Sequence, residues 1–146
     1  MALRTVAVSG GFDPIHVGHV RMFKEARALG DRLVVILNID HWLMKKKGFV
    51  FMPERERLEI IQEFPFVDEV ILTFHEEGSD DRSICRELVH VKPHVFANGG
   101  DRWEDDIPEA QVCREHAIEM VFNVGYGGKV QSSSWLTAKV KNQPNG

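Results

Sequence analysis

The sequence predicts a single α/β domain in which a five-stranded parallel sheet carries helices on both faces. Two features indicate this fold class. Short runs rich in Val, Ile and Phe alternate with longer amphipathic segments along the 146 residues, which is the pattern of right-handed β-α-β units. The short runs are almost continuously apolar, as expected of strands that are covered on both faces. Because ligands of such sheets bind at the carboxyl ends of the strands, functional residues are expected in the loops that follow them.

Five apolar runs have the length of ordinary strands and are bounded by polar or turn-forming residues. The first two, TVAVS and RLVVILN, are the most continuous, and the third, DEVILT, opens with an acidic pair. The last two, PHVFAN and IEMVFN, join aliphatic residues to Phe. We therefore predict strands at residues 5–9, 32–38, 68–73, 93–98 and 118–123.

Between the strands, apolar residues recur every three or four positions, which is the spacing of an amphipathic helix. Pro53 and Pro108 suit the first turns of two such segments, because a proline there removes no helical hydrogen bond. The last segment, SSSWLTAKV, opens with serines that can cap a helix. We predict helices at residues 18–30, 53–64, 79–91, 107–117 and 132–140. Together with the strands they form a Rossmann-like arrangement.

Composition excludes several classes of protein. A net charge of -4 with 43% hydrophobic residues fits neither a basic nucleic-acid-coating protein nor an acidic disordered one. Cys85 and Cys113 form no CxxC pair, which argues against a disulfide framework and a structural zinc site. The apolar run near the N-terminus is too short for a signal peptide, and no run reaches the ~18 residues of a membrane span. We expect one cytoplasmic domain at residues 1–140, a disordered tail at 141–146, and no nucleic-acid or membrane partner.

The stretch GGFDPIHVGH links the first predicted strand to the first predicted helix. Gly10 and Gly11 let the backbone approach a phosphate, and the free N–H groups of the following helix point to the same place. His16 and His19 are three residues apart across the first helical turn, so both imidazoles can face an anion from one side. Gly18 between them removes a side chain that would crowd the phosphate. The stretch therefore predicts an anion-binding site.

Other interpretations of this stretch have less support. A histidine at a helix start often only caps the helix, but capping alone does not explain two histidines framed by glycines after a buried strand. Metal binding by the pair has only Asp13 as a third ligand. The spacing excludes a dinucleotide-binding GxGxxG turn, and no GxxxxGK[ST] phosphate loop occurs.

GGFDPIHVGH resembles the HxGH signature of the nucleotidyltransferase superfamily, whose cytidylyltransferase-like members carry GxFDxxHxGH. The similarity continues through ARALGDRLVVILNID, KKKG, PERERLEII, FVDEVI, KPHVFANGGD and the serine run SSS. This order resembles glycerol-phosphate cytidylyltransferases and heptose-phosphate adenylyltransferase domains. The resemblance implies transfer of a nucleoside monophosphate from an NTP to a phosphorylated small molecule, with release of pyrophosphate. It also implies Mg²⁺ as cofactor and a homodimer.

The resemblance implies a role for each matching residue. His16 and His19 would hold the α- and β-phosphates, and Lys47 would be the phosphate-binding lysine of the catalytic group. Asp13 would orient the phosphate loop or help to hold the Mg²⁺. The implied nucleotide-binding residues are Gly10, Gly11, Phe12, Asp13, Gly18, Gly99, Gly100, Asp101, Ser132, Ser133 and Ser134. The implied acceptor-binding residues are Asp40, Trp42, Lys46 and Arg57.

Several of these residues have simpler alternatives. Asp13 can bond its own backbone in a turn before Pro14. Lys45, Lys46 and Lys47, expected in a loop with Gly48, can be ordinary solvated surface. Arg57 has Arg55 as a rival and can pair with Glu59 or Glu54 at helical spacing. Asp40 can cap the short helix that follows it.

The segment YGGKVQSSS departs from the cytidylyltransferase pattern, because only Lys129 stands near the serine run where that pattern has an arginine. The choice between CTP and ATP is therefore open, and so is the identity of the acceptor. A nucleotide-binding regulator that has lost turnover is the alternative function, although the complete HxGH argues against it. A dehydrogenase of the same architecture lacks its glycine fingerprint here.

Overall fold

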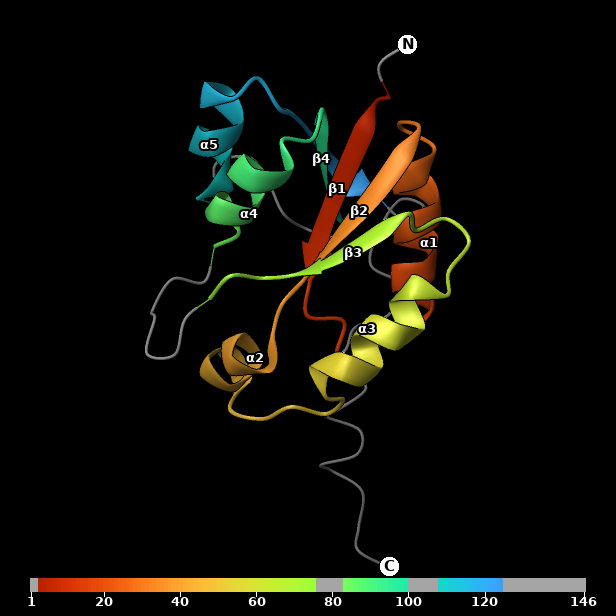
Figure 1. Ribbon diagram of the computed structural model, residues 1–146, viewed down its shortest axis with the longest axis vertical. Coiled ribbons are helices and arrows are strands. Elements are labelled where there is room, and N and C mark those ends of the chain that lie inside the picture. The colour runs from red at the N-terminus through yellow and green to blue at the C-terminus, as the bar shows by residue number, and fades with distance from the viewer. Residues whose placement is uncertain (1–2, 76–82, 100–107, 125–146) are drawn as a thin grey trace, which may run out of the picture.

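The computed structural model describes residues 3–75, 83–99 and 108–124 and confirms the predicted α/β fold (Figure 1). All five predicted strands are present, with ends that differ from the prediction by at most two residues. The predicted helix at residues 132–140 and the tail at 141–146 lie outside the described residues. The elements are β1 (Thr5–Gly10), α1 (Val17–Arg27), β2 (Arg32–Leu37), α2 (Asp40–Lys47), α3 (Glu54–Gln62), β3 (Glu69–Leu72), α4 (Cys85–Val91), β4 (Val95–Gly99), α5 (Glu109–Glu115) and β5 (Glu119–Val124).

The strands form one parallel sheet in the order β3-β2-β1-β4-β5. The chain runs from β1 outward to β3, and then returns to the other side of β1 for β4 and β5. The strand order therefore reverses between β1 and β4, and a crevice outside the carboxyl ends is expected at such a switch point. Helices α1 and α3 cover one face of the sheet, and α4 and α5 cover the other (Figure 1).

The strand residues alternate between two apolar cores, one on each face. Val6 and Val8 pack into the core under α1 and α3, which also buries Phe23 and Ile61. Ala7, between them, packs into the core under α4 and α5. The same alternation continues in β2, β3 and β4. Burial on both faces explains why the strand sequences are nearly continuously apolar.

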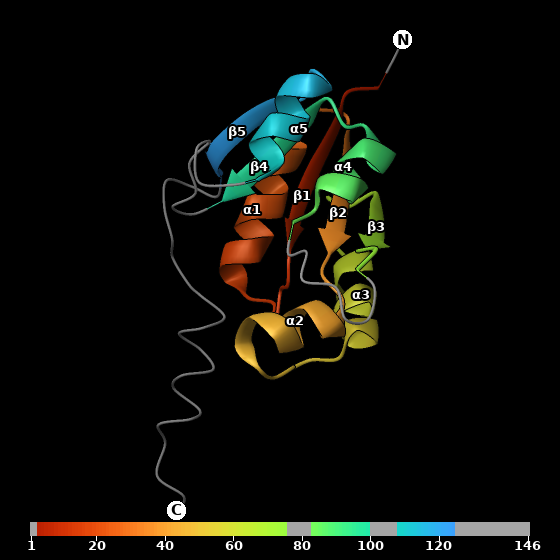
Figure 2. The ribbon, with the colours of Figure 1, turned by 90° about the vertical axis from the view of Figure 1, so that its left-hand side faces the viewer.

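Helix α2 lies below the carboxyl edge of the sheet rather than on either face (Figure 2). It includes Lys45, Lys46 and Lys47, so the predicted lysine loop is wrong: these residues form the last turn of a helix. Gly48 ends the helix in the left-handed conformation (φ 79°), and its N–H donates to the Met44 carbonyl at 2.9 Å. Cations in the last turn complement the partial negative charge at the end of the helix.

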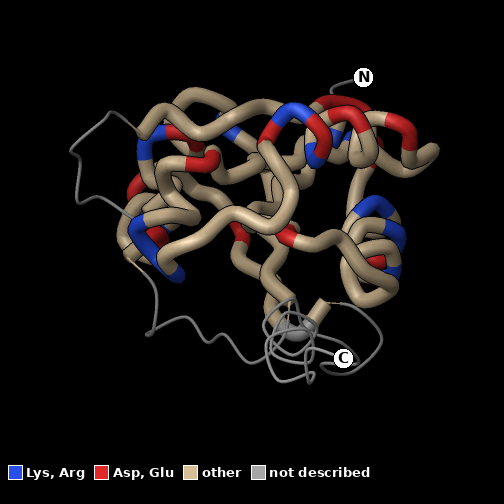
Figure 3. The backbone as a smooth tube through the Cα atoms, turned by 90° about the horizontal axis from the view of Figure 1, so that it is seen from below, with Lys and Arg blue, Asp and Glu red and all other residues tan. Residues whose placement is uncertain are grey.

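None of the helices in the described ranges is long and apolar enough to cross a bilayer. Acidic and basic positions are interspersed around the described backbone, as Figure 3 shows from the side of the carboxyl edge.

Candidate active site

The turn between β1 and α1 lies at the carboxyl edge, next to the strand-order reversal. Phe12 adopts a positive φ of 51°, and its ring is buried with edge contacts to His19 (4.7 Å between ring centroids) and Phe23 (5.1 Å). A Cβ on Gly10 would lie 2.9 Å from Cζ of Phe12, and one on Gly11 would lie 2.7 Å from Cδ2 of Leu43. Both glycines therefore allow close packing of the turn, in addition to the phosphate approach that the sequence predicts.

His16 and His19 stack face to face, with ring centroids 3.7 Å apart and planes at 22°. His16 is the N-cap of α1: its Nδ1 accepts the Gly18 N–H at 3.1 Å, while Nδ1 of His19 accepts the His16 N–H at 3.2 Å. An Nδ1 that accepts a hydrogen bond carries no proton, so the proton of each neutral ring is on Nε2. Capping thus fixes the tautomer and places the ring proton on Nε2, in two stacked imidazoles at a helix N-terminus.

Burial, and to a smaller extent electrostatic repulsion by the nearby His16, together lower the pKa of His19 from 6.5 to about 3. His19 is therefore a neutral imidazole at pH 7. A neutral imidazole can donate a hydrogen bond to an anion in a buried site without the desolvation cost that a charged imidazolium has there.

We expect the free energy of unfolding to fall as the pH decreases from about 6.5 towards 3. In this range His19 is protonated in the unfolded chain but stays neutral in the folded protein. Acid therefore lowers the free energy of unfolding by at most roughly 1.4 kcal/mol per pH unit for this one group. Urea titrations between pH 7 and 4 measure the slope. In His19→Asn, which keeps an acceptor for the His16 N–H but does not titrate, the slope should be smaller, and an equal slope would contradict this origin.

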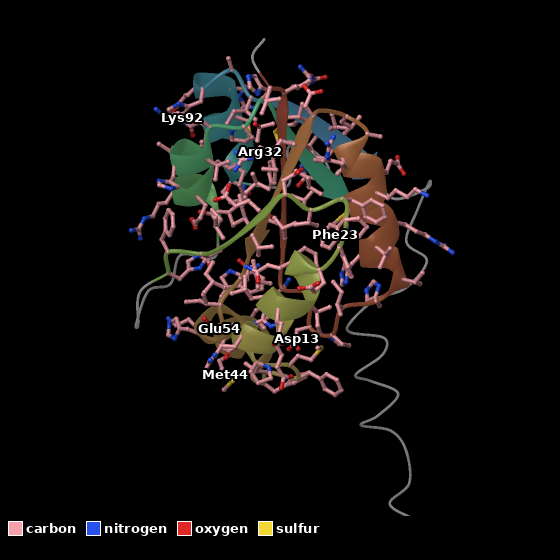
Figure 4. All side chains as sticks on the ribbon, turned by 45° about the vertical axis from the view of Figure 1, so that its right-hand side comes forward. Asp13, Phe23, Arg32, Met44, Glu54 and Lys92 are labelled. Atoms are coloured by element: carbon pink, nitrogen blue, oxygen red, sulfur yellow. The ribbon has the colours of Figure 1, made fainter. Side chains whose placement is uncertain are left out.

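Asp13 is fully buried and connects the turn to the segment between α2 and α3. Its carboxylate oxygens accept the backbone N–H groups of Phe51, at 2.7 Å, and of Met52. Nζ of Lys47 is 3.4 Å from the carboxylate and donates to the Asp13 carbonyl at 2.8 Å. Asp13 therefore neither closes a local turn nor leaves an exposed oxygen for the predicted metal. Figure 4 shows it at the same end of the molecule as Met44 and Glu54.

The lysines of α2 differ in position. Lys47 contacts Asp13 in the turn between β1 and α1, and its side chain remains 22% exposed. Nζ of Lys46 lies 4.8 Å from the centre of the Trp42 ring instead. The Trp42 ring lies beside the turn, since a Cβ on Gly11 would be 3.8 Å from Cζ3 of Trp42. The structure thus brings Lys47 and Trp42 to the turn between β1 and α1 that leads into His16, which is called the histidine turn below.

Arg57, which the resemblance implies as an acceptor-binding residue, is completely buried. Its Nε donates to the Met52 carbonyl (2.8 Å), and Nη1 donates to the carbonyls of Gly11 and Asn38 (both 2.7 Å). Nη2 donates to the Asp40 carboxylate at 2.6 Å. The guanidinium therefore joins the ends of β1 and β2 to the segment before α3, and it is not exposed to an acceptor.

The alternatives predicted for the neighbouring charges are settled by these contacts. Asp40 does not cap α2, because it is the first helical residue and its carboxylate binds Arg57. Glu54 accepts the Asp40 N–H at 3.1 Å, and Arg55 is exposed. Arg57 thus pairs with Asp40 rather than with Glu54 or Glu59.

Of the residues predicted to contact base and ribose, only Gly99 is described. A Cβ there would lie 2.9 Å from Sδ of Met22 and 3.2 Å from the Val124 carbonyl, so close packing of β4 against α1 and β5 requires glycine. Gly100, Asp101, Ser132, Ser133 and Ser134 lie outside the described residues.

A family model described as cytidylyltransferase-like matches residues 7–140. The chain belongs to the cytidylyltransferase-like family of nucleotidyltransferases. It is 38% identical over 117 residues to an FAD synthase from Ferroglobus placidus, covering 80% of this chain and 72% of that protein. It is 35% identical to the bifunctional protein HldE from Pelobacter propionicus over 93% of this chain, but this match spans only 25% of HldE.

Solved structures of similar fold accompany these relatives. A lipopolysaccharide core biosynthesis protein from Thermoplasma volcanium superposes with a TM-score of 0.69 at 28% identity, covering 86% of this chain and 99% of the other. A protein of unknown function from Archaeoglobus fulgidus, at 17% identity and a TM-score of 0.60 over 88% of this chain and 96% of the other, shares the fold.

The described residues of this cytidylyltransferase-like chain offer no metal-binding group of three or more His, Cys, Asp or Glu side chains. Both oxygens of Asp13 are already engaged. A Mg²⁺ bound mainly through substrate phosphates would not require such a group, so its site stays a prediction.

Sequence analysis missed two buried polar residues at this edge, Asn38 and Thr73. They directly follow β2 and β3, and they are 4% and 6% exposed. A polar residue directly after an apolar run was the available signal, because it follows a buried strand at the ligand-binding edge.

Proposed function

We propose that this nucleotidyltransferase transfers AMP from ATP to the phosphate of a small acceptor. An acceptor phosphate oxygen attacks the α-phosphorus in line and forms the new P–O bond. The bond from the α-phosphorus to the oxygen that bridges to the β-phosphate breaks, and pyrophosphate leaves with the electron pair. Such a reaction needs positioning and stabilisation of charge more than covalent participation by the protein.

The stacked histidine pair is the observation that carries this proposal. The stacked rings lie at the N-terminus of α1, where their Nε2–H groups and the N–H groups of the first helical turn can bind polyphosphate oxygens and stabilise the charge that grows on the leaving pyrophosphate. Since the pKa of His19 is about 3, that residue acts as a hydrogen-bond donor and not as a general base at pH 7.

The choice of ATP rests on a relative's name. FAD contains an adenylyl group, and the chain covers 72% of the FAD synthase from Ferroglobus placidus. We propose that Mg²⁺ enters with the triphosphate as part of the substrate. We further propose that the predicted contacts from Gly99, Gly100 and Asp101, and from the serines at 132 to 134, complete the nucleotide site.

A pyrophosphate-release screen tests this function directly. Purified protein is incubated with each of the four NTPs and Mg²⁺, together with FMN, sugar phosphates, polyol phosphates or phosphonates. We expect release with ATP and a phosphorylated acceptor, and a product that contains AMP joined through a diphosphate. Preference for CTP would overturn the choice of nucleotide, and tight NTP binding without pyrophosphate release would support the regulatory alternative.

We expect Lys47→Ala to raise KM for ATP or the acceptor by about ten- to a hundredfold, because it removes a charged donor beside the histidine turn. Steady-state kinetics measure the change. The matched control is Lys45→Ala in the same helical turn, for which we expect less than about a threefold effect. Equal and negligible effects of the two substitutions would identify the lysine run as ordinary surface.

A further inference from the structure

The side chain of Asn38 is buried without a full set of partners. It is 4% exposed, and its Oδ1 has no hydrogen-bond partner in the part of the chain that the structure describes. An unsatisfied buried polar atom costs roughly 1–3 kcal/mol, so its retention needs a reason, such as a bound ligand. The backbone of Asn38 is fixed on both sides, since its N–H donates to the Gly10 carbonyl (2.9 Å) and its carbonyl accepts from Arg57 (2.7 Å).

A second unpaired atom lies close in sequence. Nε2 of His41, in the first turn of α2, is buried and also lacks a partner within the described ranges. Helix α2 lies under the carboxyl edge of the sheet (Figure 2), and Asn38 directly follows β2 at that edge. Oδ1 of Asn38 and Nε2 of His41 can therefore each form a hydrogen bond that the described residues do not supply.

Strand alternation shows which face of the sheet Asn38 belongs to. Ile36 and Ile71 pack into the core under α4 and α5, so Asn38 and Thr73, two residues further along, point to the same face. The ladder continues to both residues, because Thr73 N–H donates to the Leu37 carbonyl at 3.0 Å. Thr73 Oγ1 accepts the Ile39 N–H at 3.2 Å and is 3.0 Å from Nδ1 of His75.

Thr73 lies opposite Asn38, because the two residues follow the paired Leu37 and Leu72. Ser9 adds a third polar side chain on this face, since it follows Ala7 by two positions and Ala7 also packs under α4 and α5. Ser9 is paired with Ile36, so it lies two residues before the level of Asn38 on the neighbouring strand β1. Hydroxyl and amide groups, with no charged side chain among these three residues, suit the hydroxyl groups of a ligand rather than a second phosphate or a flat apolar ring.

We infer that Asn38 is a specificity-determining residue that binds a hydroxyl group of the acceptor, next to the phosphate that attacks ATP. The acceptor then carries a polyol chain beside its phosphate. This chemistry is shared by sugar phosphates, polyol phosphates and the ribityl phosphate of FMN. The inference rests on the proposed transfer to an acceptor phosphate, and it adds which part of the acceptor the β2 edge recognises.

The test compares hydroxylated acceptors with alkyl phosphates of equal chain length. Glycerol 3-phosphate is paired with propyl phosphate, and ribose 5-phosphate and FMN are each compared with pentyl phosphate. Wild-type protein should prefer at least one hydroxylated partner by tenfold or more in kcat/KM. Asn38→Leu, which keeps the size of the side chain and removes its polar atoms, should reduce this preference to threefold or less and leave KM for ATP within about twofold. The FMN and sugar arms show which source supplies the polyol chain.

A thermal melt separates recognition from a structural role. Asn38→Leu removes an unsatisfied polar group, so its Tm should equal or exceed that of the wild type. The control is Asn98→Leu, a buried asparagine on the same face of the sheet but two strands away, in β4. Its Nδ2 already donates to the Phe96 carbonyl at 3.4 Å, so the acceptor preference should persist there. A Tm lowered by more than about 4 °C in Asn38→Leu, or an unchanged preference, would overturn the inference.

Calorimetric titration of the same acceptors, with a non-hydrolysable ATP analogue bound, distinguishes this inference from the proposed function. A polyol preference that depends on Asn38 in binding, without pyrophosphate release in the kinetic assay, would refute the transferase proposal and support the role of Asn38. If no hydroxylated phosphate binds better than its alkyl partner in either assay, Asn38 does not recognise a hydroxyl group.

Discussion

Replacing His16 or His19 by Ala should reduce kcat by about two to four orders of magnitude. In the proposed reaction each ring would donate from Nε2–H to oxygens whose negative charge increases in the transition state, and loss of one such donor typically costs a factor of 10²–10³. Because the rings are stacked and each cap depends on the other, the double variant should lose less than the product of the two single effects. Single-turnover measurements with saturating ATP give kcat independently of binding.

Asparagine variants separate this chemistry from the capping role of the histidines. Oδ1 of Asn can replace Nδ1 as the acceptor for a backbone N–H, but Asn supplies no donor at the position of Nε2. His16→Asn and His19→Asn should therefore remain near wild-type stability and lose activity as severely as the Ala variants, which also lose about 1 kcal/mol of stability with the cap. Near-native turnover in both Asn variants would show that the pair only caps α1.

The sheet could be predicted from the sequence because each strand is covered on both faces. Burial on both faces makes the strand sequences locally apolar, so β1 to β5 were visible without knowledge of their partners. The histidine turn was predictable for a similar reason, since the strand end, the glycines and the helix start are contiguous in sequence.

A short helix after Asp40 was expected, but its extension through Lys47 was not predicted, because the helix lies below the edge of the sheet and packs on it with little of its surface. Leu43 is its one buried residue, so the sequence has no apolar periodicity there. The bonds from Phe51 and Met52 to Asp13 join residues nearly forty positions apart, and backbone N–H donors leave no trace in the identity of a residue. Long-range polar contacts of this kind require the fold.

The burial of Arg57 did leave a signal in the sequence. Arg57 precedes Ile61 by one helical turn, and both residues are completely buried in α3. An arginine on the apolar side of a helix indicates an internal guanidinium with many carbonyl partners, since a buried charge must be paired. Glu59, by contrast, lies on the exposed side of the same helix.

Arg57→Met should destabilise the protein by about 3 kcal/mol. The substitution keeps an apolar stem but removes the donors that hold the carbonyls of Met52, Gly11 and Asn38, and it leaves Asp40 without its partner. Arg57→Lys keeps the charge but has no planar fork, so it should recover less than half of the loss. Urea denaturation at pH 7 gives these differences, with Arg55→Met, on the exposed side of the same helix, as a control that should change stability by less than about 0.5 kcal/mol.

The Arg57 variants also decide between a positioning role and direct contact with the acceptor. If the guanidinium acts by holding the ends of β1 and β2, kcat should fall together with stability, because the histidine turn follows Gly11 and the acceptor edge follows Asn38. Arg57→Lys should then restore activity only as far as it restores stability. A variant that is as stable as wild type but has a raised KM for the acceptor alone would instead show that Arg57 leaves its buried position to bind the acceptor phosphate.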